Sequence, residues 1–157
     1  MDWNCYVLVL EVMCDIEAKL ARSSVILKPG VYLYIGSSRG PGGALARIIR
    51  HVSSSKKAWW HVDSLTLSPC CALKGFYLLN SACKDCELEV SQRLARLFSY
   101  VPGFGSADKP QSPSHLFICS EDYENCTCKV YSILERIECV VDVIYVDAGG
   151  DNLRIIK

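Results

Sequence analysis

The residues best suited to chemistry stand close together in one stretch of the chain. Between Gly30 and His51 the sequence reads GVYLYIGSSRGPGGALARIIRH. An apolar run ends at a tyrosine, a glycine-rich turn follows, and the next segment carries Arg47, Arg50 and His51. Backbone N–H groups at such a turn and helix start bind anions, and arginine matches the geometry of phosphate. This stretch therefore predicts a site that holds a phosphate group.

Two local elements would position these side chains. Residues 31–35 are β-branched, aromatic or leucine, which is typical of a strand, and the strand would end at Gly36. Residues 44–52 predict a short helix. Its apolar face would be formed by Leu45, Ile48, Ile49 and Val52. We expect that face to pack on the protein and the basic side chains to point elsewhere.

The rest of the chain predicts an α+β domain. Residues 6–12 form an apolar run typical of a strand buried on both faces. Further strands are expected at 24–27, 72–79, 115–119, 137–146 and 153–156, the last two forming a C-terminal hairpin. A second helix is expected over 85–100, with an inner stripe of Leu88, Ser91, Leu94, Ala95 and Phe98. Residues 106–114 are polar and predict a surface loop.

Length and charge limit the classes of protein to which this chain can belong. A chain of 157 residues, half of them hydrophobic, is expected to form one domain with a real core. It has no apolar run of about 18 residues and no signal-peptide pattern, which predicts a cytoplasmic protein without a membrane span. Residues 18–62 hold eight Lys or Arg and no acid, whereas 121–151 hold eight acids against two basic residues. The basic stretch suits a polyanion, although chance segregation on a solvated surface is the simpler interpretation.

The chain contains ten cysteines at irregular spacing. Cys83 and Cys86 together with Cys126 and Cys128 could supply four thiolates to zinc, but one residue separates the second pair, so zinc is the least favoured use. Disulfides, which occur inside hyperthermophiles, and reduced thiols both stay open.

Several motifs, taken in order, resemble the GIY-YIG nuclease superfamily. The strand end Tyr34-Ile35-Gly36 resembles the second half of that signature, and Asn4-Cys5-Tyr6 stands where the first half has Gly-Ile-Tyr. Further segments are similar to a poorly characterised archaeal and bacterial branch, found alone or fused to endonuclease III. These segments are Trp60-His61-Val62-Asp63, Glu87-Leu88-Glu89, Pro102-Gly103-Phe104-Gly105 and Ser114-His115-Leu116-Phe117.

This resemblance implies a small central, mostly antiparallel sheet flanked by helices. It also implies a metal-dependent endonuclease that hydrolyses DNA phosphodiester bonds, with DNA repair as a setting. Residues 1–127 would form the nuclease domain, and 128–157 a β-rich extension packed on the same domain.

The resemblance also assigns roles residue by residue. Tyr6 and Tyr34 would flank the scissile phosphate, and one of them would help to deprotonate the attacking water. Arg47 would stabilise the phosphate charge, and His51 completes the catalytic set. Glu87, with Glu89 as the alternative, would hold one Mg²⁺ or Mn²⁺, which needs only one or two carboxylates. DNA contacts are expected from Arg39, Arg50, Lys56, Lys57, Trp60, His61 and His115, because aromatic side chains beside cations suit nucleic acid.

Each of these residues also suits an ordinary structural role, so two other functions stay open. One is a catalytically inactive nucleic-acid-binding module on the same fold, which keeps the basic stretch and does not need Glu87. The other is a protein that binds a partner, or a second copy of itself, through the acidic C-terminal tail by pairing of strand edges. Metal-dependent cleavage would distinguish the nuclease from the inactive binding module. Salt-dependent binding of nucleic acid would distinguish both of these from the partner-binding protein.

Overall fold

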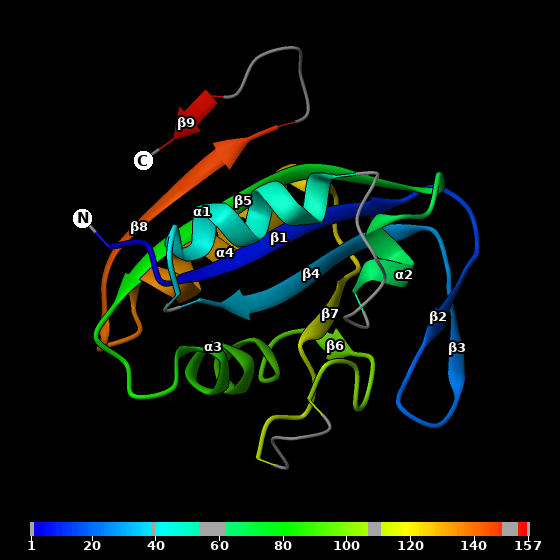
Figure 1. The fold of residues 1–157 in the computed structure, drawn as a ribbon, viewed down its shortest axis with the longest axis horizontal. Coiled ribbons are helices and arrows are strands. Elements are labelled where there is room, and N and C mark those ends of the chain that lie inside the picture. Colours follow the sequence, from blue (N-terminus) through cyan, green and yellow to red (C-terminus); the bar gives the residue numbers. More distant parts are fainter. Residues whose placement is uncertain (1, 39, 54–61, 107–110, 149–153, 157) are drawn as a thin grey trace.

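The computed structural model describes residues 2–38, 40–53, 62–106, 111–148 and 154–156. Its centre is a seven-stranded sheet in the order β6-β7-β4-β1-β5-β8-β9, in which all neighbouring strands are antiparallel (Figure 1). The strands are β1 (Cys5–Val12), β4 (Gly30–Ser37), β5 (Cys71–Ser81), β6 (Ser99–Tyr100), β7 (Leu116–Cys119), β8 (Val140–Asp147) and β9 (Arg154–Ile156). A separate hairpin joins β2 (Ile16–Lys19) to β3 (Ser24–Leu27), and the helices are α1 (Gly43–Val52), α2 (Asp63–Thr66), α3 (Cys86–Leu94) and α4 (Tyr123–Glu135).

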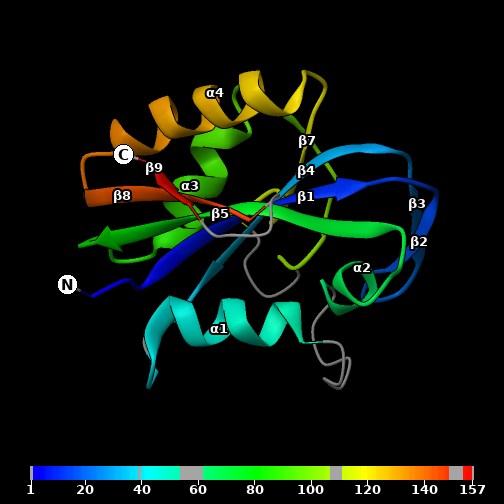
Figure 2. The same ribbon diagram turned by 90° about the horizontal axis from the view of Figure 1, so that it is seen from above.

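Strand β1 lies in the middle of the sheet and explains its two hydrophobic layers. Successive side chains of a strand point to opposite faces, so Val7 and Val9 enter one cluster while Leu8 and Leu10 enter the other. Helices α3 and α4 cover the first face, and α1 lies across the second (Figure 2). Both faces of β1 are covered, which confirms the strand buried on both faces that the apolar run at residues 6–12 predicted. The predicted α+β class and the C-terminal hairpin β8–β9 are confirmed.

Helix α4 was not predicted from the sequence. Its start is capped by Asp122, whose side chain accepts a hydrogen bond from the Asn125 backbone N–H at 2.9 Å. Its buried face repeats every four residues through Cys126, Val130 and Leu134. The domain boundary expected between residues 127 and 128 therefore lies inside a helix, and the segment 128–157 begins with helix rather than strand.

The helix expected over 85–100 is also shorter than predicted. It ends at Leu94, and Ser99–Tyr100 instead form the edge strand β6. The predicted surface loop at 106–114 is partly wrong, since Ser112 and Ser114 are buried. The Ser91 hydroxyl of α3 lies 2.7 Å from that of Ser112 and donates to the Ser114 carbonyl at 2.9 Å. These hydrogen bonds hold the segment before β7 against α3.

Helix α1 is rotated about its own axis, so that the face it buries differs from the one predicted. Its buried side chains are Ala44, Ile48 and His51. Most of the predicted inner face points outward, with Leu45, Ile49 and Val52 exposed to 44%, 67% and 57%. The helix start is fixed by a hydrogen bond from the Ala44 backbone N–H to the Trp3 carbonyl at 2.8 Å. The rotation turns His51 toward the sheet.

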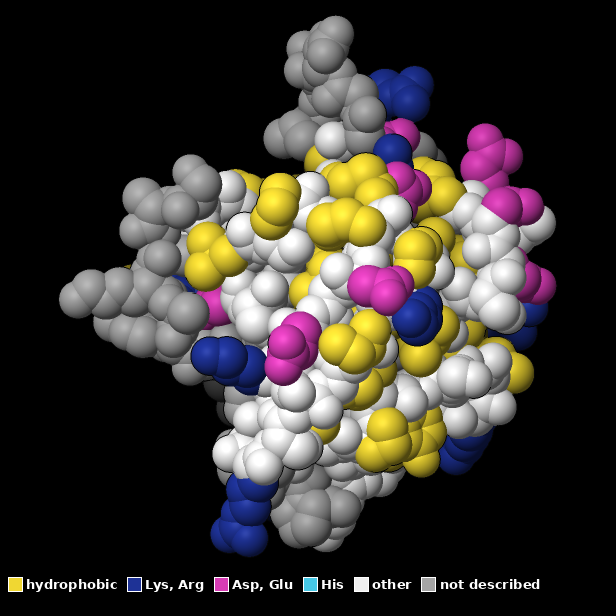
Figure 3. All heavy atoms as spheres, turned by 90° about the vertical axis from the view of Figure 1, so that its right-hand side faces the viewer, with side chains coloured by type: hydrophobic (Ala, Val, Ile, Leu, Met, Phe, Trp, Pro, Cys, Tyr) yellow, Lys and Arg dark blue, Asp and Glu magenta, His cyan; other side chains and the backbone are white. Residues whose placement is uncertain are grey.

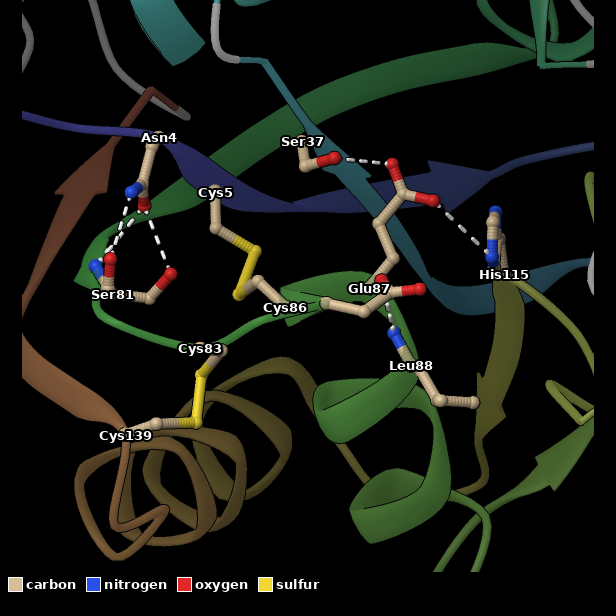
Figure 4. The surroundings of a disulfide bond; sticks show 11 residues. Asn4, Cys5, Ser37, Ser81, Cys83, Cys86, Glu87, Leu88, His115 and Cys139 are labelled. Carbon is tan, nitrogen blue, oxygen red and sulfur yellow. Dashed lines mark hydrogen bonds and ion pairs between the residues drawn. A yellow bond between two sulfur atoms is a disulfide. The ribbon is translucent and has the colours of Figure 1, made fainter.

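Four disulfides join eight of the ten cysteines. They join Cys5 to Cys86, Cys14 to Cys70, Cys83 to Cys139 and Cys119 to Cys126, whereas Cys71 and Cys128 are not disulfide-bonded. Three of the four cysteines considered as zinc ligands therefore have oxidised sulfurs. Two disulfides hold the start of α3, one to β1 and one to the segment before β8 (Figure 4).

The surface mixes charge and apolar side chains. On the face at the β2–β3 end, hydrophobic side chains lie among acidic and basic ones (Figure 3). Lys28 is paired with Asp15 at 2.8 Å, so the basic stretch 18–62 is partly neutralised by acids outside it. None of the helices in the described ranges has the length and apolar character that a bilayer span requires.

Candidate active site

A small cavity of about 140 Å³ collects side chains from five parts of the chain. Its walls come from β1, β4, α1, α3 and the connection between β6 and β7, which contributes Gly105 and His115. The lining residues are Tyr6, Tyr34, Gly36, Ser37, Arg47, Glu87, Gly105 and His115. Four of the side chains that the resemblance assigned to catalysis or metal binding thus meet in one place, and His115 joins them.

The pairing of β1 with β4 brings the two tyrosines together. In the antiparallel register Tyr6 stands opposite Gly36, and Tyr34 stands opposite Leu8, so both phenols lie on the same face at diagonal positions. The glycine is required by this arrangement, because a Cβ atom at position 36 would overlap the Tyr6 ring. The missing side chain at Gly36 therefore makes the space that the Tyr6 phenol occupies.

His51 connects α1 to the tyrosines. The Tyr6 hydroxyl oxygen lies 2.8 Å from Nε2 of His51, and both side chains are buried. The Tyr34 ring meets the imidazole edge-on, with ring centroids 6.0 Å apart. When the imidazole proton is on Nδ1, the Tyr6 O–H donates to Nε2. The pair is then arranged to pass a proton from the phenol to the imidazole.

Both cavity tyrosines are neutral at physiological pH. Burial raises the pKa of the Tyr6 phenol well above its usual range, and the neighbouring Tyr34 adds to the shift while Arg47 opposes it. Burial also raises the pKa of Tyr34, followed by the effect of the Glu87 carboxylate. A neutral phenol can donate a hydrogen bond or relay a proton, but it does not supply a standing phenolate base.

Glu87 presents its carboxylate to the cavity from the first turn of α3. Its Oε1 accepts a hydrogen bond from the Ser37 hydroxyl at 2.6 Å, and its Oε2 lies 3.5 Å from Nε2 of His115 (Figure 4). The helix start is capped by Asp85, which accepts from the Leu88 backbone N–H at 3.2 Å. The disulfide at the preceding residue, Cys86, ties this turn to β1. The carboxylate is thus held in place by both side-chain contacts and covalent structure.

The donor set fits a hard divalent cation that keeps most of its waters. One carboxylate with a neighbouring hydroxyl is the minimum protein contribution that Mg²⁺ or Mn²⁺ needs. Glu89 is not among the described residues that line the cavity, as expected for a residue two positions away on a helix. Within the described ranges, no group of three or more His, Cys, Asp or Glu side chains forms a ready-made metal site. Glu87 is therefore the better placed of the two glutamates.

The other predicted contacts divide into three groups. His115 lies in the cavity beside Glu87. Arg50 does not line the cavity, because its guanidinium forms two 3.0 Å hydrogen bonds with the fully buried carboxylate of Asp63. Arg39, Lys56, Lys57, Trp60 and His61 lie outside the described residues.

The sequence did not single out Ser37, Gly105 and Asp63 as site residues. Ser37 directly follows the Tyr34-Ile35-Gly36 motif, and Gly105 closes the Pro102-Gly103-Phe104-Gly105 motif, so their positions carried a signal. Gly105 adopts a φ of +73°, and a Cβ atom there would lie 3.3 Å from His115. Its role is to let the chain turn close to that imidazole.

In the comparison with known proteins, one family model matches a stretch of the chain that includes every described residue lining the cavity. The model of a family described as a domain of unknown function, DUF123, matches residues 5–137, which run from the start of β1 to just past α4. Comparisons with curated proteins and with solved structures gave no match. The extent of the family match shows that this chain belongs to the DUF123 family.

Proposed function

We propose that this chain is a metal-dependent endonuclease of the GIY-YIG type that hydrolyses phosphodiester bonds in DNA. The observation that carries the proposal is the convergence of Tyr6, Tyr34, Arg47 and Glu87 on one cavity. These residues were named from sequence motifs in separate parts of the chain. Their convergence on one cavity supports the resemblance, because residues chosen from separate motifs could have lain far apart in the fold.

The cavity offers the groups that phosphodiester hydrolysis needs. Arg47 supplies a permanent positive charge for the phosphate oxygens, whose negative charge grows in the transition state. Glu87 would hold Mg²⁺ or Mn²⁺, and the bound ion supplies Lewis-acid stabilisation of a phosphate oxygen. His115 and Ser37 keep the Glu87 carboxylate turned toward the cavity.

The Tyr6–His51 pair accounts for proton transfer with a neutral phenol. As a water attacks phosphorus, its proton passes to the Tyr6 oxygen while the phenolic proton passes to His51 Nε2 across 2.8 Å. The phenol is neutral before and after the transfer, so its raised pKa is no obstacle. His51 is the residue that gains the proton, and Tyr6 acts as the relay.

One observation favours the inactive binding module as a second candidate. Both carboxylate oxygens of Glu87 already have partners in the protein, at 2.6 Å to Ser37 and 3.5 Å to His115. Such contacts also suit a purely structural glutamate. Edge pairing with another chain through β9 stays a prediction that rests on the position of β9 at the end of the sheet.

Cleavage of labelled duplex, flapped and branched DNA with Mg²⁺, Mn²⁺ or EDTA tests the proposal. We expect metal-dependent cleavage that is lost in Arg47→Ala and Glu87→Gln. Glu89→Gln is the matched control, because it removes a carboxylate from the same first turn of α3 but not from the cavity wall. Salt-sensitive binding without cleavage of any substrate would refute the nuclease and support the binding module.

A further inference from the structure

A groove of about 550 Å³ lies between α4 and the hairpin β8–β9, away from the cavity described above. Helix α4 and α1 lie on opposite faces of the sheet, so the groove and the Arg47 side of the cavity are separated by the sheet (Figure 2). None of the described residues that line the groove also lines the candidate active site. Its chemistry can therefore be considered independently of nuclease activity.

Three tyrosine rings form much of the groove wall. They belong to Tyr123 and Tyr131 of α4 and to Tyr145 of β8. Their hydroxyls are engaged within the protein: Tyr131 donates to the Val143 carbonyl at 3.2 Å, and the hydroxyls of Tyr123 and Tyr145 are hydrogen-bonded to each other. What these residues offer to a ligand is mainly aromatic surface.

Carboxylates surround that aromatic surface. Glu124 and Glu135 come from α4, and Asp147 comes from the end of β8. The one basic side chain among the described lining residues is Arg154, which pairs with Asp147 at 3.1 Å and is itself 75% exposed. The lining therefore carries a net charge of about −2 at neutral pH, since carboxylates are ionised there.

Aromatic surface edged by negative charge selects organic cations. Ring faces attract ammonium groups, and carboxylates add Coulomb attraction. The Tyr123 ring already makes a contact of this kind within the protein, because the Lys74 ammonium, which does not line the groove, lies 5.9 Å from the centre of that ring. Anions would be repelled by the net negative charge of the lining.

We infer that the groove between α4 and β8–β9 is a binding site for an alkylammonium group. Both a free polyamine and a lysine side chain of another protein carry this chemistry. The acidic C-terminal region, whose role the sequence left open, would then serve cation recognition. The site belongs to the sheet face that does not carry the Tyr6–His51 pair.

Cys128 provides a reporter inside the groove. It lies on the same face of α4 as Glu124 and Tyr131, it is exposed, and it is not disulfide-bonded. In Cys71→Ser protein, Cys128 is the one cysteine outside the four disulfides. Its thiolate attacks an alkyl methanethiosulfonate, forming a mixed disulfide and releasing methanesulfinate. Dividing each reagent's rate at Cys128 by its rate with 2-mercaptoethanol removes the reagents' own reactivity, and comparing a trimethylammonium reagent with a sulfonate reagent then leaves the effect of the charge around Cys128.

At low ionic strength we expect the normalised rate of the cationic reagent to exceed that of the anionic one about tenfold. Glu124→Gln/Glu135→Gln should abolish this difference. Glu121→Gln/Glu138→Gln, which removes two carboxylates near the ends of α4 but not from the groove, should keep it. Equal normalised rates with both reagents, or equal losses in the two double variants, would overturn the inference.

Protection of Cys128 then tests the aromatic contribution and the source of the ammonium group. Spermidine or a lysine-rich peptide should slow the cationic reagent at concentrations where sodium chloride of equal ionic strength does not. Tyr131→Leu should weaken that protection about threefold, and Tyr131→Phe, which keeps the ring, should retain it. Protection by spermidine alone indicates a free amine, and protection by the peptide alone indicates a partner's lysine. No protection by either would refute the site even if the reagents differ in rate.

Discussion

Removing the disulfide between Cys5 and Cys86 should destabilise the protein more than removing the one between Cys119 and Cys126. A disulfide limits the freedom of the unfolded chain, and the effect grows with the length of the loop that it closes. The residues bridged in the two cases are 81 and 7 positions apart in sequence. The comparison therefore depends on loop length, and all four cysteines are buried.

The 81-residue separation overstates the closed loop, since Cys14–Cys70 already bridges most of it. The shortest remaining path from Cys5 to Cys86 through that bridge is about 25 residues, which corresponds to about 3.5 kcal/mol of unfolding free energy. The seven-residue separation of Cys119 and Cys126 corresponds to about 2.5 kcal/mol. We thus expect Cys5→Ser/Cys86→Ser to lose about 1 kcal/mol more than Cys119→Ser/Cys126→Ser.

Guanidinium unfolding without reductant measures both losses against the parent protein. The buried serines introduced in each variant cost a similar amount and largely cancel in the comparison. Mn²⁺ titration followed by electron paramagnetic resonance adds a local readout, because Cys5 and Cys86 directly precede Tyr6 and Glu87. We expect weaker Mn²⁺ binding in the first variant only. Equal losses of stability, or a larger loss in Cys119→Ser/Cys126→Ser, would refute the loop-length reasoning.

Three further predictions follow from the site. Arg50→Ala should cost about 3 kcal/mol in guanidinium unfolding, because it takes a counter-charge from buried Asp63. Arg47→Ala should abolish cleavage. Because the pKa of Tyr6 is raised in the native state, the native protein keeps a phenolic proton that the unfolded chain loses above about pH 10. The free energy of unfolding should therefore hold below about pH 10 and fall above it, less steeply in Tyr6→Phe. Urea unfolding from about pH 8 to 11 measures both slopes. Gly36→Ala should displace the Tyr6 ring and lower the cleavage rate at least tenfold, with unfolding measurements showing a loss of about 1–3 kcal/mol.

The sheet was predictable because its strands have strong local signals. Residues 6–12 and 31–35 are rich in β-branched and aromatic side chains, and both form central strands. Once they pair antiparallel, the positions of Tyr6 and Tyr34 on one face follow from strand geometry. The tyrosine half of the candidate site was therefore accessible from sequence.

Features set by contacts distant in sequence were not accessible. Helix α1 has an apolar stripe and a stripe ending in His51, and the choice of buried face depends on contacts with Trp3 and Tyr6. Helix α4 is short of apolar residues at its start, so its polar first turn resembled a loop despite the Asp122 cap. The disulfide pairing among ten cysteines depends on which sulfurs the folded chain brings together, which spacing alone does not reveal.

The close approach of Gly36 and Tyr6 also has an evolutionary consequence. Two positions that share one volume cannot change independently, so a lineage can gain a side chain at 36 only after shrinking the one at 6. Within the family, an alanine or serine at the position of Gly36 should therefore be accompanied by loss of the phenol at the position of Tyr6. Such a pair of substitutions would identify relatives that keep the fold and have lost the proposed reaction.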